Sequence, residues 1–248
     1  MKIDAQGLYY RDLNKQIRDA VANGAERIEL VNVNGQYYIG DGINRPVTIT
    51  VNGVPGNDLG AFLNGATIVV QDNGQDNIGN TMNAGKVIVH GHAGDVLGYG
   101  MRGGRVHILK DVGYRVGIHM KSYNDNKPVL IAGGNAGDFF GEYMAGGVLI
   151  LLGMFSDEPD KPKHGFRFGT GMHGGVIYVR GTVDEVKLSQ EVGVFELTQE
   201  DQAELEEYLK DYCRDFKLDF KEVMKEQFVK ILPKSKRPYG NMYCPMPR

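Results

Sequence analysis

Histidine and carboxylate side chains, the types that bind metals or transfer protons, recur in the middle of the chain. His90 and His92 form an H-x-H pair that could supply two metal ligands. No Cys, Asp or Glu set at zinc-like spacing accompanies this pair. We therefore expect these histidines to be surface or corner residues and assign no metal site to the chain.

The best candidates for acid/base catalysis are Asp95, Asp138 and Glu142. The two aspartates lie in the matching stretches "AGDVLG" and "AGDFFG", and an Asp that follows a Gly commonly caps its own turn by binding the local backbone. No Ser or Cys lies beside a His as an activated nucleophile would. We assign no catalytic residue and expect the aspartates to be structural.

Two stretches, "VLGYGMRGG" and "FGTGMHGG", spell the G-x-G-x-x-G pattern of a dinucleotide-binding loop. Such a loop follows a strand and opens a helix within a βαβ unit of about 30 residues. Here each stretch leads into an apolar run typical of a strand, "RVHIL" or "VIYV". We assign no cofactor-binding residue and interpret the pattern as a by-product of a repeat.

That repeat is an apolar residue, a Gly, two variable residues and a Met. Its copies end at Met82, Met101, Met120, Met144 and Met172, with an earlier copy ending at Leu63. In chain order from Leu63 to Met120, successive copies are 19 positions apart, and the last two intervals are 24 and 28. A fixed period near 20 residues is typical of a solenoid, in which each coil buries its apolar face against its neighbours.

Each copy is followed by two apolar residues spaced two apart, as expected for one face of a strand. These pairs are Ile68 and Val70, Val87 and Val89, Val106 and Ile108, Val129 and Ile131, Leu149 and Leu151, and Ile177 and Val179. The fourth pair assumes an insertion of four residues after Met120. A 19-residue coil has no room for a crossover helix, so the sequence predicts a mainly β fold, a parallel β-helix. The methionines should fill its interior, and glycine pairs such as Gly103–Gly104 should form its corners. The longer intervals predict the loops "KSYNDNK" and "MFSDEPDKPKHGF".

The residues that alternate with these pairs along each strand should face outward, and their character changes along the chain. Early and middle coils carry Thr67, Lys86, Arg105 and His107, whereas late coils carry Val148, Ile150, Val176 and Tyr178. Because contiguous exposed apolar surface usually marks an interface, something should cover the late coils. We favour the chain's own C-terminal helices, with another subunit as the alternative.

The flanking segments predict three regions: residues 1–58 with a helix and strands, a solenoid over 59–183, and a helical tail over 184–248. Near the start, Asp12 and Gly24 should bound a helix. The following "RIELVNVNGQYYIG" reads as a hairpin at Asn34–Gly35 or as a first solenoid coil. In the tail we expect a helix capped by Thr198 and Asp201, then one from Phe220 to about Leu232 capped by Asp219 and ended by Pro233.

Composition excludes several classes of partner and indicates the cellular compartment. The formal net charge is −3, and the short "KSKR" is the only dense basic cluster, so nucleic-acid binding is not expected. No apolar run approaches the length of a membrane helix, and the N-terminus does not read as a signal peptide, so we expect a cytoplasmic chain. The two cysteines, Cys213 and Cys244, are too few for an iron–sulfur cluster and are expected to be ordinary thiols.

The repeat region resembles a known family. Its stretches "GNDLGAFLNGATIVVQDNGQDNIGNTMNAGKVIVHGHAGDVLGYGMRGGRVHILKDVGYRVGIHMK" and "GGNAGDFFGEYMAGGVLILLG" are similar to the GXGXG domain at the C-terminal end of the glutamate synthase large subunit. The resemblance spans about Val31 to Val183. It implies a right-handed parallel β-helix, here with an N-terminal α/β segment and C-terminal helices added.

The resemblance also implies a role. It predicts a non-catalytic, stand-alone structural subunit of a split glutamate synthase, which makes glutamate from glutamine and 2-oxoglutarate. FMN and an iron–sulfur cluster are then expected on the partner subunits, the amidotransferase and synthase parts, with no cofactor on this chain. Self-association of this chain into a homo-oligomer is left as an open alternative. Two alternatives are a scaffold of the formylmethanofuran dehydrogenase type and a sugar-active β-helix enzyme.

Overall fold

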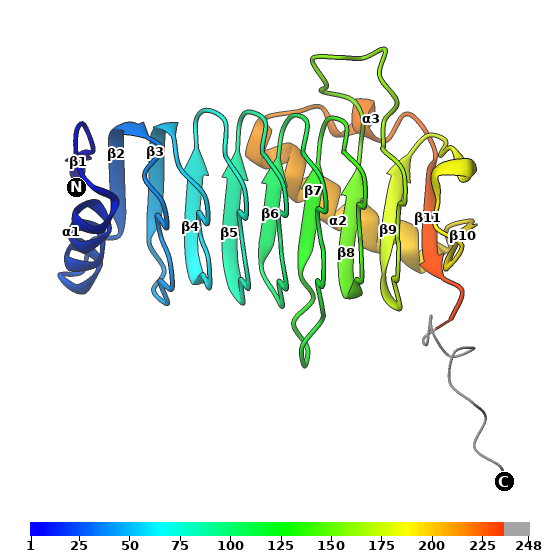
Figure 1. Ribbon diagram of the computed structural model, residues 1–248, viewed down its shortest axis with the longest axis horizontal. Helices are drawn as coiled ribbons and strands as arrows, with labels where there is room; N and C mark the ends of the chain where they lie inside the picture. The colour runs from blue at the N-terminus through cyan, green and yellow to red at the C-terminus, as the bar shows by residue number, and fades with distance from the viewer. Residues whose placement is uncertain (236–248) are drawn as a thin grey trace, which may run out of the picture.

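The protein is an elongated solenoid in which strands from successive coils lie side by side (Figure 1). Its structure is a computed structural model that describes residues 1–235. The strands are β1 (Lys2–Asp4), β2 (Arg27–Asn34), β3 (Thr48–Val54), β4 (Asn64–Val70), β5 (Ala84–Val89), β6 (Arg105–Ile108), β7 (Val129–Ala132), β8 (Ala145–Leu151), β9 (Gly174–Arg180), β10 (Val192–Phe195) and β11 (Phe228–Pro233). The helices are α1 (Tyr10–Ala22), the 3-10 helix η1 (Glu185–Lys187), α2 (Gln199–Phe216) and α3 (Phe220–Val223).

A single sheet runs the length of the molecule, in the order β1 to β9, then β11, then β10. Every pairing from β1 to β9 is parallel, so the expected parallel β-helix is confirmed. β11 pairs antiparallel with both β9 and β10, and β10 forms the far edge of the sheet. No helix within residues 1–235 combines the length and the apolar character needed to cross a bilayer.

The interior of the solenoid is built from columns of aligned apolar residues. Met82, Met101, Met120, Met144 and Met172 are all fully buried, as predicted. The register sets Val87 against Val106 and Val89 against Ile108, and these side chains are also fully buried. A coil of this size cannot fill its own interior, so each side chain depends on the coils above and below it.

The inward pair of the fourth coil differs from the predicted Val129 and Ile131. Leu130 continues the Val106 column and Ala132 the Ile108 column, while Val129 and Ile131 point outward. The insertion after Met120 is one residue longer than we assumed, and a slip of one residue exchanges the two faces of a strand. The run "VLIA" is apolar on both faces, so its pattern did not reveal the slip.

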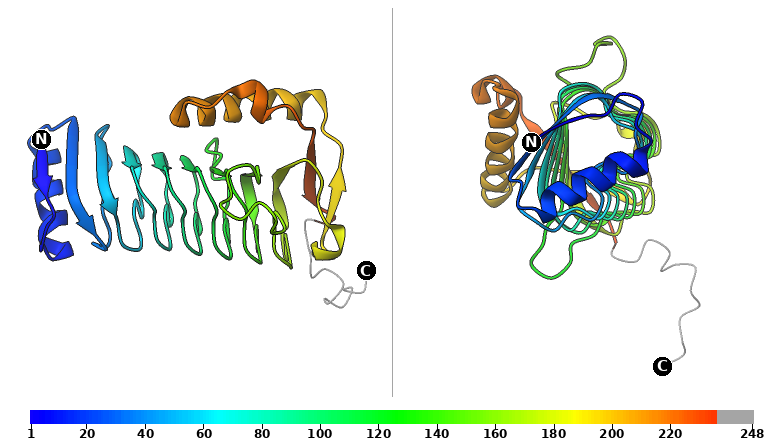
Figure 2. Two further views of the ribbon diagram at one scale, coloured as in Figure 1. Left: turned by 90° about the horizontal axis from the view of Figure 1, so that it is seen from above. Right: turned by 90° about the vertical axis from the view of Figure 1, so that its left-hand side faces the viewer.

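The N-terminal segment forms the first coil and covers its open end. β2 pairs in parallel with both β1 and β3, so the solenoid alternative is right and a hairpin at Asn34–Gly35 is wrong. Helix α1 lies across the end of the coil (Figure 2) and buries Leu13, Ile17 and Ala20. It begins one turn before the expected cap, with Tyr9 at the N-cap position and Asp12 inside the first turn.

The predicted helix from Phe220 to Leu232 is wrong beyond its first turn. Asp219 caps the one-turn α3 as expected, because its side chain accepts a hydrogen bond from the Lys221 N–H at 2.9 Å. The chain then extends as β11, whose Lys230 is in register with Tyr178 of β9. Strand formation wins here because it satisfies the backbone edge of the last coil, a long-range demand that a local helical pattern does not show.

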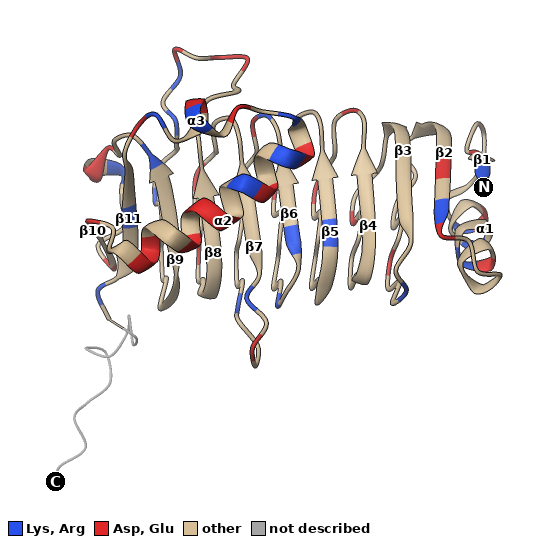
Figure 3. Ribbon diagram, turned by 180° about the vertical axis from the view of Figure 1, so that it is seen from behind, with Lys and Arg blue, Asp and Glu red and all other residues tan. Residues whose placement is uncertain are grey.

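Helix α2 lies along the outward side of β6–β9 (Figure 3). We call this outward side of strands β3–β9 the strand face. Thr198 and Asp201 form the predicted capping box at the start of α2. Its apolar stripe packs on the late coils, where Val129, Ile131, Val148, Ile150 and Tyr178 are buried with Leu205, Tyr208, Leu209 and Tyr212. The expected intramolecular cover of the apolar strand face is therefore confirmed.

Candidate functional site

The glycine motif forms a corner of the coil. Gly98 has a φ of +66°, and a Cβ there would lie 3.1 Å from Cδ1 of Leu130 in the next coil. A Cβ at Gly103 would lie 2.2 Å from the Asn83 carbonyl oxygen. The motif then runs directly into β6, with no helix to receive a pyrophosphate. These glycines serve close coil-to-coil packing.

The candidate aspartates lie at corresponding corners and bind backbone. Asp95 accepts a hydrogen bond from the Tyr114 N–H, and Asp138 accepts one from the Phe166 N–H, each at 2.8 Å. Each carboxylate thus caps the turn of the next coil, whereas we had expected it to cap its own turn. The corner aspartates form a ladder that holds successive coils in register.

Glu142 is buried beneath the corner residues, with 5% of its surface exposed. Its carboxylate pairs with the guanidinium of Arg115 from the preceding coil. His90 and His92 have other neighbours. The His90 ring packs edge-on against Phe216, while His92 Nε2 lies 2.8 Å from Asp157 Oδ2.

The remaining sequence candidates include the two thiols. Cys213 is buried in α2, and burial raises the pKa of its thiol to about 11. A thiol with a raised pKa is a poor nucleophile and a poor metal ligand at neutral pH. Cys244 lies outside the described residues.

A charged cluster that sequence reasoning missed lies where the C-terminal half of α2 crosses β5 and β6. Lys86 Nζ is 2.8 Å from Asp211 Oδ1 and 3.0 Å from Asp215 Oδ2. Arg105 pairs with Asp211, and His107 Nδ1 lies 2.6 Å from Asp215 Oδ2. The spacing was visible in the sequence: Asp211 and Asp215 are four apart on one helix face, and Lys86 and Arg105 are one coil apart.

The pKa shifts in this cluster follow from burial and from the hydrogen bonds among its members. Burial acts to raise the pKa of Asp211 and Asp215, but hydrogen bonds from His107, Lys86 and Arg105 outweigh it and leave both values lowered. Burial lowers the pKa of His107 despite the nearby Asp215, so the neutral imidazole donates from Nδ1. Its Nε2 is buried and has no hydrogen-bond partner among residues 1–235.

The donor set could in principle hold a metal, because ligand atoms of His107, Asp211 and Asp215 lie within 4.8 Å of one another. However, the Lys86 ammonium already lies against both carboxylates, and Arg105 neutralises Asp211 further. A divalent cation would have to displace Lys86. The arrangement is suited to fastening α2 to the sheet with charge-assisted hydrogen bonds.

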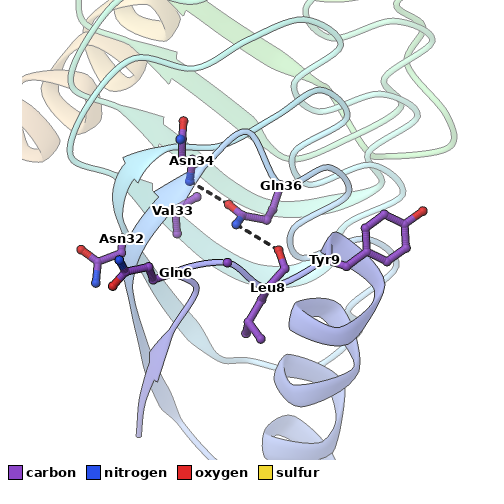
Figure 4. Close-up of a pocket in the computed structure, with 8 residues that line it drawn as sticks. Gln6, Leu8, Tyr9, Asn32, Val33, Asn34 and Gln36 are labelled. Carbon is purple, nitrogen blue, oxygen red and sulfur yellow. Dashed lines mark hydrogen bonds between the residues drawn. The ribbon is translucent and has the colours of Figure 1, made fainter.

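A shallow pocket opens beside the start of α1 (Figure 4). It is lined by Gln6, Gly7, Leu8, Tyr9, Asn32, Val33, Asn34 and Gln36. The Gln36 side chain accepts a hydrogen bond from the Asn34 N–H at 2.7 Å and donates one to the Leu8 carbonyl at 3.3 Å. Gln36 thus ties the N-terminal segment to the first coil, and the amide side chains around it offer no acid or base.

The side of the solenoid away from α2 carries aromatic and basic residues, of which Phe139 and Tyr143 are half-buried and the others exposed. We call it the turn face and define it on the later coils by Tyr99, Tyr114, Arg115, His119, Phe139, Tyr143, Phe166 and Arg167. The ring of His119 stacks on Tyr143 at 5.3 Å and meets Tyr99 edge-on at 5.9 Å. In a second row, the Arg115 and Arg167 guanidinium carbons lie 4.6 and 5.8 Å from the Phe139 ring centre.

The sequence profile of the GXGXG motif matches residues 13–236, which includes most of α1, the solenoid from β2 onward and α2. The chain belongs to the GXGXG family, that of the C-terminal domain of the glutamate synthase large subunit. It is also 46% identical over 250 residues to an uncharacterised protein of Methanocaldococcus jannaschii. That alignment covers 98% of this chain and 96% of the relative, so the GXGXG protein with its flanking segments recurs as a whole.

Proposed function

We propose that this GXGXG protein is a non-catalytic structural subunit of a split glutamate synthase, which converts glutamine and 2-oxoglutarate to glutamate. The observation that carries the proposal is the family match over residues 13–236. The site chemistry agrees with a structural role, since the carboxylates of Asp95, Asp138, Glu142, Asp211 and Asp215 are all engaged in backbone or ion-pair contacts. In this proposal the amidotransferase active site, the FMN and the iron–sulfur cluster belong to partner subunits in the cytoplasm.

The proposal is tested by purifying the tagged full chain from its own cells. The sample should contain further subunits, show flavin absorbance and iron, and form glutamate from glutamine and 2-oxoglutarate. The same chain expressed by itself should be colourless and inactive. A native sample that carries molybdenum or tungsten subunits in place of a flavoprotein would reject the glutamate synthase assignment, as would stoichiometric flavin or iron bound to the isolated chain.

A further inference from the structure

The turn face is built from backbone positions that favour glycine. The residue before each column methionine has a positive φ, and in all coils but the last its N–H donates to a carbonyl of the next coil, as from His119 to Glu142 and from Tyr143 to Thr170. Gly100 and Gly171 occupy this position with φ of 56° and 65°. His119 and Tyr143 adopt nearly the same φ, 55° and 50°, at a cost that glycine avoids. The solenoid does not need these side chains for its backbone path.

Three cations on this face or close to it in the sequence lack carboxylate partners among the described residues, whereas Arg115 is paired with Glu142. Arg102, Lys121 and Arg167 are exposed, and within residues 1–235 none of them forms an ion pair or a side-chain hydrogen bond. The carboxylates that neighbour these rows in the sequence are engaged: Glu142 is buried and paired with Arg115, and Asp95 and Asp138 accept hydrogen bonds from backbone N–H groups. The turn face of the later coils therefore offers unpaired cations to a partner, although the whole chain has a net charge of −3.

The ring geometry indicates which kind of partner fits. A guanidinium lies near the Phe139 ring from the coil on either side, and the His119 ring is stacked on Tyr143. Rings engaged in this way present edges and flanking guanidinium N–H groups to a partner. Such groups suit carboxylates set among apolar side chains, and aromatic residues and arginine are the types that contribute most to protein interfaces.

On the strand face of the same molecule, cations and apolar residues of the same kind are already covered by carboxylates and apolar side chains. There Lys86 and Arg105 are paired by Asp211 and Asp215 of α2, and the neighbouring apolar residues are covered by the same helix. We propose that the turn face of the later coils is a docking surface for a partner subunit that presents an acidic surface with apolar side chains among its carboxylates. This inference rests on the proposed function, which supplies the existence of partner subunits.

The first test uses variants of the tagged full chain purified from its own cells. His119→Gly combined with Tyr143→Gly removes two side chains where the backbone accepts glycine, and Arg167→Glu reverses an unpaired charge. Each should weaken retention of the partner at least about tenfold, as expected for residues central to an interface. Circular dichroism and thermal unfolding should show an intact fold.

Matched controls exist at the other end of the solenoid. Phe62 occupies the same corner position with a φ of 55° and is 53% exposed, and Arg45 is an exposed cation. Phe62→Gly and Arg45→Glu should leave the complex unchanged. Equal retention by the test variants and the controls would overturn the docking surface.

The occupant is identified by placing a photo-crosslinking amino acid at Tyr143 and, as a control, at Tyr38 in an early coil. Crosslinks from position 143 alone should map to a net acidic segment of another subunit. Crosslinks to a second copy of this chain, or to a basic segment, would overturn the inference. If an acidic partner is captured but the sample lacks flavin, docking stands and the glutamate synthase proposal fails. If flavin is retained by all variants, the proposed function stands and this surface fails.

Discussion

The two long faces of the solenoid differ in how their outward apolar and charged side chains are covered. On the strand face, every cation of the middle coils is paired and the apolar residues of the late coils lie beneath α2. On the turn face, aromatic residues such as Tyr99 and Phe166 are 41% and 57% exposed, and Arg167 has no carboxylate partner among the described residues. The interior columns are alike beneath both. A regular solenoid thus fixes the core and leaves each face free to be covered from within or from outside.

Both faces lie over the same tightly packed interior, and substitutions there should have the largest effect on the free energy of unfolding. Met101 is fully buried between coils, so Met101→Asp should destabilise the protein by more than about 4 kcal/mol or unfold it, because it buries an unpaired carboxylate. Met101→Leu, which keeps volume and polarity, should cost under about 1.5 kcal/mol. Chemical denaturation measures both. An aspartate variant as stable as the parent would show that the methionine column does not line the interior.

Substitutions in α2 where it covers the strand face should have the next largest effect on stability. Leu209 of α2 is fully buried against the late coils, so Leu209→Ala should cost about 2 to 5 kcal/mol. It should also increase the binding of a hydrophobic dye, because α2 loosens over Ile150 and Tyr178. Glu200→Ala, at an exposed position of the same helix, is the matched control. Unchanged stability and dye binding in the leucine variant would mean that α2 contributes little to covering this face.

The charged end of α2 should give the strand face a pH dependence. Burial lowers the pKa of His107 below its unfolded value of about 6.5, so the unfolded chain takes up the proton first as the pH falls. Stability should therefore decline below about pH 6.5, by at most about 1.4 kcal/mol per pH unit for one proton. The groups that face this ring are Asp215, Asp211 and Lys86.

His107→Asn retains a donor for Asp215 but cannot titrate, so it should flatten the decline in urea unfolding between pH 7 and pH 5. His119→Asn, on the exposed turn face, is the control. The same decline in the His107 variant and the parent would place its origin in other groups, of which His90 and His164 also have a pKa lowered by burial.

The sequence predicted the parts of the fold that repeat. The methionine column, the outward residues from Thr67 to Tyr178 and the capping box at Thr198 could all be recognised because period and cap chemistry are local patterns. The prediction failed where a long-range contact decides: the register of "VLIA" depends on the length of one loop, and β11 forms to pair with β9.

The charged cluster under α2 was missed for a related reason. Its members were recognised one by one as outward or helical residues, but Lys86 and Asp211 are 125 positions apart. Only the packing direction of α2 brings them together. The turn face was equally hidden, since its residues are successive corners whose shared orientation depends on the positive φ of each coil.

The smallest expected effect is on the turn face itself and gives the sharpest contrast. Tyr143→Gly relieves a positive φ of 50°, worth about 1 kcal/mol, but loses the stack on His119, worth about 0.5 to 1.5 kcal/mol. The net change in unfolding free energy should lie within about 1 kcal/mol of zero. Ile150→Gly on the strand face should cost several times more, because that side chain is fully buried beneath α2. Gly100→Ala isolates the backbone contribution: its Cβ meets nothing closer than Thr81 Oγ1 at 3.7 Å, so the destabilisation of about 1 kcal/mol expected there comes from φ alone. If Tyr143→Gly proves as costly as Ile150→Gly, the side chains of the turn face stabilise the isolated chain. Their exposure would then not indicate a surface for a partner.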